Sequence, residues 1–314
     1  NTFKNTTELK DIAIRGSSAE KRLLRVASML DGLIMKQKTD PCALVISPAD
    51  MMELVPLTVD KDGRLLVQYD LSDMAGSGLL TINFVGLDAL TVIQRTCEHI
   101  KKSHGTDIKL EKVPLTDRAT YELLQSGFTG GIFQLQSETA RDLIKRLKPA
   151  TFEDIAAFNA IFHRNPLAGG HADELIERKN GRIEIAYPHP LLEPLLKETC
   201  GLFIYQEQFM HAAAIIAGYS MSQANSLRRT LGKSCVNELK KERTRFIKGA
   251  GKKGIDRERA GHVFDLMKDH VFFSFSKAHA LAWALLTFRS AYLKAHFPNQ
   301  FMEAVLSVCD DCYC

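Results

Sequence analysis

Residues 79–87 read Leu-Leu-Thr-Ile-Asn-Phe-Val-Gly-Leu, and the character of the sequence changes across this stretch. Leu79 to Val85 is a short apolar run of the length typical of a β-strand. After Gly86 the pattern becomes helical and stays helical along the rest of the chain. The stretch therefore predicts the boundary between a part that contains strands and a part built of helices.

Ahead of this boundary, a helix is expected first and strands follow it. Ser17 and Glu20 have the spacing of a capping box, and the apolar residues behind them predict a helix over 18–34. Residues 60–63 are typical of a tight turn. The apolar runs that predict strands lie at 42–47 (CALVIS), 65–69 and 79–85. We expect these strands to form a small mixed sheet.

Behind the boundary, the pattern predicts a mostly helical region. The expected helices cover 89–103, 138–147, 152–162, 204–217, 222–231, 236–249, 257–270 and 278–296. Residues that end helices support these ranges, namely Pro149, Gly218, Gly232 and Pro298. The fold class is therefore α+β, with a small mixed sheet and flanking helices up to about residue 88 and helices thereafter.

The composition is that of an ordinary globular protein. Of the 314 residues, 45% are hydrophobic and 25% charged, which excludes a disordered tail. No apolar run approaches the roughly 18–20 residues of a transmembrane helix, and the polar start lacks the apolar core of a signal peptide. The missing initiator Met and the abrupt stop at Cys314 suggest that both ends are cuts in a longer protein. We expect a cytoplasmic protein without membrane contact.

The seven cysteines are an odd number and mostly scattered, which argues against a disulfide framework and for a reducing compartment. Cys309, Cys312 and Cys314 do cluster, and thiolates at this spacing can bind zinc. Four ligands are usual, however, and no nearby His completes the set. A ragged terminus is the alternative interpretation, and we expect no metal site here.

Positive charge is concentrated in one part of the chain. Residues 221–260 contain twelve Lys and Arg against four Asp and Glu, an excess of eight, whereas the whole chain carries only +4. The rest of the chain therefore has a net charge of −4. Such a block is either a solvated helix face or a surface that meets a phosphate backbone or a triphosphate.

Four segments are more specific than composition. They read Gly131-Ile132-Phe133-Gln134-Leu135 with Lys145-Arg146-Leu147-Lys148-Pro149; Tyr187-Pro188-His189-Pro190-Leu191-Leu192-Glu193-Pro194 with Tyr205-Gln206-Glu207-Gln208; Leu227-Arg228-Arg229 with Gly232-Lys233; and Phe275-Ser276-Lys277-Ala278-His279-Ala280 with Tyr292-Leu293-Lys294-Ala295-His296-Phe297-Pro298. Together, and at this spacing, they resemble the alpha subunit of bacterial DNA polymerase III, a C-family replicative polymerase. The resemblance covers nearly the whole chain, from about residue 10 to 308.

The resemblance implies a layout in which a palm that carries carboxylates is interrupted by a thumb and followed by long helical fingers. Residues 1–30 would be the end of a thumb-like region, 31–88 the second half of a palm-like domain and 89–314 a fingers-like helical domain. The family is a DNA-directed DNA polymerase, that is, a nucleotidyltransferase. The implied partners are primer–template DNA, a deoxynucleoside triphosphate and replisome proteins.

In the family, nucleotide addition uses two Mg²⁺ ions held by three Asp of the palm. Two of these Asp lie in the first half of the palm, outside this sequence. The third lies in a strand that reads Phe-Asp-Phe-Leu-Gly-Leu, and the matching residue here is Asn83. An amide has nearly the shape of a carboxylate but no charge to offset a cation. We therefore expect the catalytic position to be degenerate at Asn83 and Mg²⁺ to be bound poorly.

The resemblance also implies where the phosphates of the nucleotide bind. Arg228 and Arg229, with Lys233 just after the helix, would contact the triphosphate, because the arginine fork suits phosphate oxygens. Lys277 and His279 would line the same cleft. The alternative is that these residues are cations on a solvated helix end.

Tyr205, Gln206 and Gln208 match the family closely. We expect them to form a polar network that holds the fingers, with contacts to nucleotide or template as the alternative. Arg164 is a further residue expected at the cleft.

Several stretches that shape the family's site are changed. The family's His-Ala-Gly-Gly is Asp40-Pro41-Cys42-Ala43, its Arg-Pro-Gly-Pro is His163-Arg164-Asn165-Pro166, and its Gly-Tyr-Gly-Phe-Asn-Lys is Phe272-Phe273-Ser274-Phe275-Ser276-Lys277. Glycines permit a close backbone approach that Ala43, Asn165, Phe272 and Ser274 would hinder. The apolar helix faces, by contrast, are intact. A pseudo-enzyme that keeps its core and loses its site is expected to show this combination.

Three functional hypotheses follow. In the first, the chain binds primer–template DNA and nucleotide but has no catalysis of its own. In the second, it is part of a longer or split active polymerase whose other segment supplies the paired Asp. In the third, it is a protein-interaction scaffold of a replisome without DNA binding. Salt-dependent DNA binding that weakens when Arg228 and Arg229 are changed would favour the first, an upstream Asp-x-Asp pair the second, and co-purification with replisome subunits without DNA affinity the third.

Overall fold

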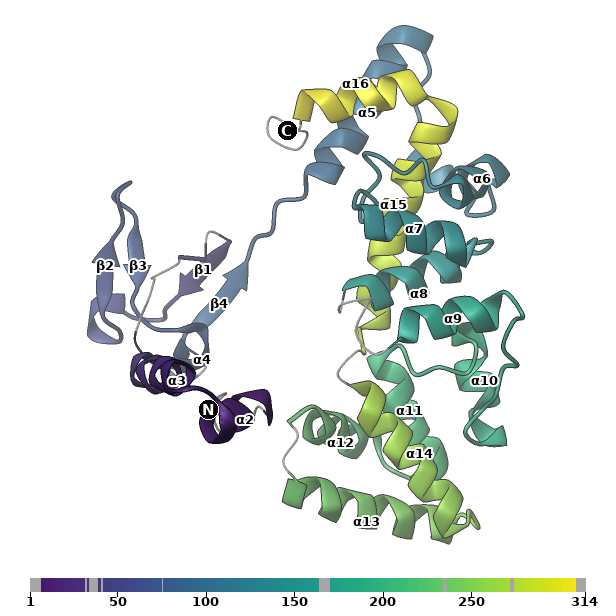
Figure 1. Ribbon diagram of the computed structural model, residues 1–314. Helices are drawn as coiled ribbons and strands as arrows, with labels where there is room; N and C mark the ends of the chain where they lie inside the picture. Colours follow the sequence, from purple (N-terminus) through teal and green to yellow (C-terminus); the bar gives the residue numbers. More distant parts are fainter. Residues whose placement is uncertain are drawn as a thin grey trace. The chain divides into compact units, whose positions relative to one another are not determined.

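A computed structural model of the chain (Figure 1) describes residues 7–31, 33, 39–40, 42–74, 76–163, 170–233, 236–271 and 274–308. The chain divides into two compact units, Asn1–Gly86 and Leu87–Cys314. We call them the strand-containing unit and the helical unit. The expected α+β class is confirmed, since all strands of the described residues lie in the first unit and most helices in the second.

The strand-containing unit begins with two helices, α2 (Thr7–Arg15) and α3 (Ser18–Leu30). The capping box predicted before α3 is present. The Ser17 backbone N–H donates to Glu20 Oε2 at 2.7 Å, and the Glu20 N–H donates to Ser17 Oγ at 3.3 Å. The helix ends at Leu30, four residues before the predicted end, because Asp31 already has an extended backbone with ψ 124°.

The strands of this unit form two antiparallel ladders and not one mixed sheet. Strand β1 (Ala43–Ile46) pairs with β4 (Leu80–Asn83), and β2 (Leu57–Val59) pairs with β3 (Leu65–Val67). The predicted turn explains the second ladder: the Asp60 carboxylate accepts the N–H groups of Asp62 and Arg64, which closes a hairpin. Hairpin strands are antiparallel, whereas a parallel pair needs a long crossover. The short segments η1 (Met51–Glu53) and α4 (Leu71–Met74) complete the unit.

Little of the strand-containing unit is buried. Among its described side chains only Val55 and Met74 are buried, at 4% and 5% exposure. Apolar side chains on both strands of the β1–β4 ladder are exposed, for example Leu44 and Leu80.

The helical unit has two hydrophobic clusters, and the first is arranged around α15 (Lys277–His296). This long helix contacts α5 (Asp88–His104), α6 (Arg118–Ser126), α8 (Phe152–His163) and α16 (Pro298–Val308), as Figure 1 shows. Helix α7 (Glu138–Leu147) packs on α6 and on α9 (His171–Lys179). Buried residues recur at helical spacing along α15, namely Ala280, Ala284, Phe288 and Ala291, so one face of α15 supplies the centre of this cluster.

The second cluster joins α10 (Glu193–Leu196), α11 (Gln206–Ala217), α12 (Met221–Lys233), α13 (Val236–Lys252) and α14 (Arg257–His270). Its largest fully buried side chains are Phe209, Phe246 and Phe264, one each from α11, α13 and α14. The short segments η2 (Leu110–Lys112), η3 (Pro190–Leu192) and η4 (Lys197–Thr199) lie between helices along the chain.

Most predicted helix ends are confirmed. Gly218 is left-handed with φ 71° and ends α11, and α16 begins at Pro298 directly after α15. Gly232 does not end its helix, because α12 continues to Lys233. The prediction missed α2, α6, α9 and α16, and also the short helices α4 and α10. None of the helices in the described part of the chain is long and apolar enough to cross a membrane.

Candidate nucleic-acid interface and polar network

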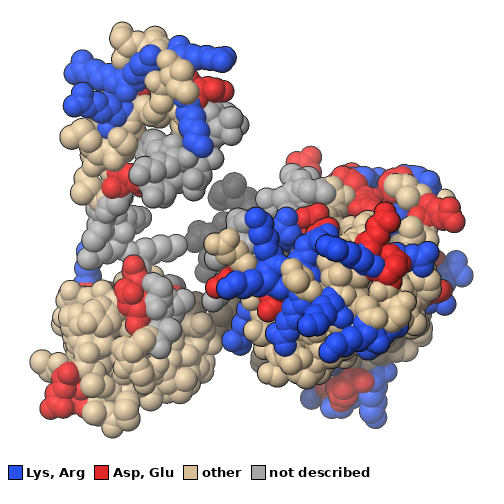
Figure 2. All heavy atoms as spheres, turned by 90° about the horizontal axis from the view of Figure 1, so that it is seen from below, with Lys and Arg blue, Asp and Glu red and all other residues tan. Residues whose placement is uncertain are grey.

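The basic block of the sequence, residues 221–260, covers α12, α13 and the first turn of α14. Viewed from below in Figure 2, Lys and Arg gather on the helical unit. On α13, Phe246 and Ala250 are buried, whereas the opposite face is exposed. That face carries Lys241, Arg245, Lys248 and Lys252, which we call the α13 stripe.

Most cations of the α13 stripe have no acidic partner in the described residues. Only Arg245 has one, Glu242 at 3.7 Å, and its guanidinium also lies 5.1 Å from the centroid of the Tyr219 ring. Other cations of the block have structural roles. Arg243 binds Asp265 through two hydrogen bonds of 3.0 and 2.8 Å, which lowers the pKa of the Asp265 carboxyl. Lys253 donates to the carbonyls of the last turn of α11. The α13 stripe therefore carries positive charge that carboxylates of the described residues offset only at Arg245.

The arginines expected to bind phosphate lie on α12. Arg228 is half-buried and donates to Asn225 Oδ1 at 3.3 and 3.2 Å, and Arg229 is exposed. Leu227 and Leu231 anchor α12 in the second cluster. Lys233 is the last residue of α12, and its side chain lies outside the described part of the structure. Arg164 also lies outside the described residues.

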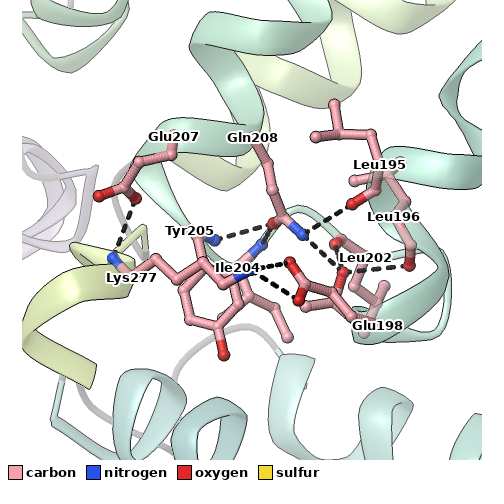
Figure 3. A network of polar contacts seen from close by, with 10 residues as sticks. Leu195, Leu196, Glu198, Leu202, Ile204, Tyr205, Glu207, Gln208 and Lys277 are labelled. Atoms are coloured by element: carbon pink, nitrogen blue, oxygen red, sulfur yellow. Dashed lines mark hydrogen bonds and ion pairs between the residues drawn. The ribbon is translucent and has the colours of Figure 1, made fainter. Parts of the chain in front are cut away.

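Gln208 is the centre of a buried polar network (Figure 3). It is 2% exposed, and its Oε1 accepts the backbone N–H groups of Ile204 at 2.8 Å and Tyr205 at 2.9 Å. Its Nε2 donates to Thr199 Oγ1 at 2.9 Å. The Thr199 hydroxyl in turn donates to the Leu202 carbonyl at 2.6 Å. One amide thus fixes the chain that leads from η4 into α11.

Tyr205 and the start of α15 lie side by side. An isolated parallel bridge joins Tyr205 and Phe275: the Gln206 N–H donates to the Phe275 carbonyl at 2.8 Å, and the Phe275 N–H donates to the Ile204 carbonyl at 3.0 Å. Burial raises the pKa of the Tyr205 phenol, so this side chain stays neutral. The backbone of Gln206 makes its bond to Phe275, and its side chain is half-buried.

Lys277 belongs to this network. Its ammonium forms an ion pair with Glu198 at 2.7 and 2.8 Å and lies 5.7 Å from the centroid of the Tyr205 ring. Its backbone N–H donates to Glu207 Oε2 at 2.9 Å (Figure 3). The charge of Lys277 is therefore offset by a carboxylate before any phosphate is bound.

His279 is exposed and packs against aromatic rings. Its ring centroid lies 4.5 Å from Trp283, at a right angle, and 5.1 Å from Phe275. The structure thus brings Tyr205, Gln208 and Lys277 together. Among the described residues, no hydrogen bond or ion pair connects this network with Arg228 or Arg229.

The position expected for a metal carboxylate lies at the end of β4. Asn83 is exposed and pairs with Ala43 of β1, and the next residue, Phe84, donates its N–H to the Cys42 carbonyl at 2.7 Å. Among the described residues, no group of three His, Cys, Asp or Glu side chains is placed to hold a metal ion. These residues therefore do not fit a two-metal centre. The cysteines expected to be a ragged terminus, Cys309, Cys312 and Cys314, lie outside the described part.

Of the four residues expected to hinder a close backbone approach, two lie in the described part. Ala43 occupies a regular strand position in β1. Ser274 is buried and donates its hydroxyl to the Val271 carbonyl at 2.6 Å, which ties it to the end of α14. The other two, Asn165 and Phe272, are outside the described residues.

Sequence reasoning missed the two carboxylates that hold Lys277. Glu207 stands inside the quoted Tyr205–Gln208 segment, so its position was visible but its role was not. No sequence pattern pointed to Glu198, because it lies 79 residues from Lys277 and only the fold brings the two side chains together.

Two family models match this chain, one in each of its two units. Residues 89–254 match the family model of the bacterial DNA polymerase III alpha subunit finger domain, and residues 1–86 match that of the bacterial DNA polymerase III alpha NTPase domain. The chain is similar to the DNA polymerase III subunit alpha of Aquifex aeolicus, with 38% identity over 91% of this chain and 25% of that protein. For the Pseudomonas aeruginosa subunit the identity is 37% over 97% of this chain and 27% of that protein.

The Escherichia coli subunit gives a similar result, with 38% identity over 91% of this chain and 26% of that protein. The chain thus spans about a quarter of the length of the curated relatives it matches. The finger-domain match alone covers more than half of the chain. The chain therefore belongs to the family of bacterial DNA polymerase III alpha subunits.

Proposed function

We propose that the helical unit binds primer–template DNA through the α13 stripe and a deoxynucleoside triphosphate through Arg228, Arg229 and Lys233, and that the chain contributes no nucleotidyl transfer of its own. The α13 stripe is the single observation that carries this proposal. The similar proteins are DNA polymerase III alpha subunits, which supports a role in DNA synthesis. Because the chain spans about a quarter of those relatives, the activity of a whole alpha subunit is not transferred to it.

The geometry of the α13 stripe suits a nucleic-acid backbone. Its first and last members, Lys241 and Lys252, are eleven residues apart on one helix, a rise of about 16 Å at about 1.5 Å per residue. One strand of DNA presents a phosphate about every 3.4 Å along the axis, so the stripe spans roughly five phosphates. Lys241, Lys248 and Lys252 have no acidic partner in the described residues and are available to them.

The arginines of α12 are better placed to bind a triphosphate than to stabilise the fold. Arg228 has only an amide oxygen of its own helix as partner, and Arg229 has no ion pair within the described part. Arginine forms paired hydrogen bonds with phosphate oxygens. Lys277, by contrast, is held by Glu198 and Glu207 and acts in this proposal as a positioning residue for the start of α15.

The chemistry of the strand end supports binding without catalysis. A two-metal reaction needs carboxylates that offset the charge of both cations. Asn83 offers a neutral amide on an exposed strand end, and the described residues hold no cluster of carboxylates. The proposal therefore assigns Asn83 no catalytic step.

The test is the salt dependence of binding to a fluorescent primer–template duplex, measured by anisotropy. Each phosphate contact contributes about 0.9 to the slope of log K against log salt. The triple variant K241Q/K248Q/K252Q is expected to reduce that slope by up to about 2.7 between ~50 and ~200 mM salt. An Arg228→Gln/Arg229→Gln variant is expected to weaken triphosphate binding, and to change the duplex slope less than the triple variant does.

A matched control removes three other exposed lysines of the helical unit, as K101Q/K102Q/K112Q. It loses the same net charge, so it separates a local contact from a general effect of charge. A triple variant with the same slope as the natural chain would contradict the proposal. So would a control variant that weakens binding equally.

A further inference from the structure

The turn after α6 carries an exposed aromatic ring. Phe128 is 75% exposed, the largest exposed fraction among the phenylalanines of the described residues. It stands in the sequence Gly127-Phe128-Thr129-Gly130-Gly131, between the end of α6 and α7. A single exposed apolar side chain is ordinary on a protein surface, so the groups around the ring decide whether it has a ligand.

The backbone around Phe128 is fixed on both sides. Gly127 is the left-handed cap of α6 with φ 79°, and the Phe128 N–H donates to Ser126 Oγ at 3.2 Å. Thr129 is buried, and its hydroxyl donates to the Leu135 carbonyl at 2.7 Å. Gly131 lies so close to α16 that a Cβ there would be 2.9 Å from Val305. The ring is therefore presented by a rigid turn, which lowers the entropic cost of binding.

Three cations surround the same turn. Lys294 of α15 donates to the Gly130 carbonyl at 2.6 Å. A Cβ on Gly130 would lie 3.5 Å from Arg141 Nη2 and 3.8 Å from Lys294 Nζ, and one on Gly127 would lie 3.7 Å from Lys145 Cβ. Arg141 and Lys145 are one turn apart on α7 and both exposed. At most about 10 Å of backbone separates the two glycines.

No carboxylate that the structure describes compensates these charges. Among the described residues, none of Arg141, Lys145 and Lys294 forms an ion pair with a carboxylate, although neighbouring Arg146 is paired with Asp142 and Asp173. Burial, and to a smaller extent the charge of Arg141, lowers the pKa of the Lys294 ammonium. Like charges gathered around one turn favour a bound anion.

We propose that this turn binds single-stranded nucleic acid, with one base stacked on Phe128 and the adjoining phosphates on Arg141, Lys145 and Lys294. An aromatic platform beside a basic groove is how proteins bind unpaired strands without reading sequence. The site lies on the first hydrophobic cluster, on α6, α7 and α15 (Figure 1), whereas the α13 stripe lies on the second. It therefore goes beyond the proposed duplex contact and does not depend on it.

The experiment measures binding of a fluorescein-labelled oligo(dT) of about 12 nucleotides to the full chain by anisotropy. Loss of one base–aromatic stack is worth roughly 5- to 150-fold in affinity, so Phe128→Ala is expected to weaken binding by about tenfold. Phe128→Trp keeps a stacking surface and is expected to bind as the natural chain does. The R141Q/K145Q variant is expected to reduce the salt slope by up to about 1.4, since each phosphate of a single strand contributes about 0.7.

Two controls show whether the effect is specific to this turn and to unpaired strands. Leu306→Ala removes another exposed apolar side chain, 65% exposed on α16, and is expected to leave binding unchanged. Binding of a blunt duplex is expected to be unchanged in Phe128→Ala. The K241Q/K248Q/K252Q variant is expected to show the reverse pattern, with weaker duplex binding and a smaller effect on oligo(dT), so each proposal can fail alone.

Three results would overturn the inference. The first is equal oligo(dT) affinity for Phe128→Ala and the natural chain. The second is displacement of the oligonucleotide by thymidine monophosphate at equal concentration, which would assign the site to a free nucleotide. The third is a shift in sedimentation of Phe128→Ala without a change in oligo(dT) affinity, which would assign the ring to a contact between protein copies.

Discussion

Replacing Gln208 by methionine tests the polar network most sharply. Methionine has nearly the same length and fills the same volume, but it removes an acceptor and a donor. The amide oxygen of Gln208 now accepts two backbone N–H groups, from Ile204 at 2.8 Å and Tyr205 at 2.9 Å. All three residues are buried, so water cannot replace the lost acceptor without opening the structure.

The magnitude follows from these two donors. A buried donor left without a partner costs about 1–3 kcal/mol. Two such groups therefore cost roughly 2–6 kcal/mol, and the apolar methionine offsets part of this cost. We expect the free energy of unfolding of the helical unit to fall by about 2–4 kcal/mol.

Trp283 is the only tryptophan of the chain and lies in α15, against Phe133 and Phe275. Its fluorescence during urea unfolding therefore reports on the helical unit alone. Gln206→Met is the matched control, because Gln206 is half-buried, its backbone makes the bond to Phe275, and we expect a change below about 0.5 kcal/mol. A Gln208→Met midpoint equal to that of the control would refute the reasoning.

Further predictions concern two helix contacts. Gly249→Ala is expected to destabilise the helical unit by about 1–3 kcal/mol, because a Cβ there would lie 2.3 Å from the Ala217 carbonyl oxygen. Gly251→Ala, two residues further along α13, places its Cβ in open space and is expected to be neutral or stabilising by up to about 1 kcal/mol. Urea titrations of both variants check this, and equal shifts would contradict the close approach of α11 and α13. The rings of His171 and His270 lie 4.3 Å apart, and burial lowers the pKa of both, so the unfolded chain takes up protons at higher pH. The contribution of these two histidines to the free energy of unfolding is therefore fully present above about pH 6.5, and it is lost as the pH falls below that value. A His270→Gln variant whose free energy of unfolding depends on pH as strongly as that of the natural chain would contradict this.

Local patterns in the sequence predicted the parts of the fold that depend on local physics. The capping box at Ser17 and Glu20 and the left-handed Gly218 act within one helical turn, and both are confirmed. The change of pattern after Gly86 reflects the loss of strand-forming runs, and the boundary between the two units falls at the same residue. Among the helices that were missed, α9 has a charged sequence with few apolar residues.

Contacts between distant residues could not be predicted in the same way. The pairing of β1 with β4 joins residues 34 to 40 positions apart, and a hairpin closed by Asp60 decides which strands are left to pair. Lys277 was predicted to line a cleft, but only the fold shows that Glu198 offsets its charge. The cations around the Phe128 turn come from α7 and α15, so no short motif contains them.

The central claim is that the chain binds primer–template DNA without extending it. The most direct measurement incubates the full polypeptide with a labelled primer–template and deoxynucleoside triphosphates, in Mg²⁺ and separately in Mn²⁺, at a protein concentration where anisotropy shows the DNA to be bound. We expect a bound primer of unchanged length in both metals, because Asn83 carries no charge to offset a metal ion and the described residues hold no carboxylate cluster. A primer lengthened by even one nucleotide would contradict this claim and identify an active polymerase.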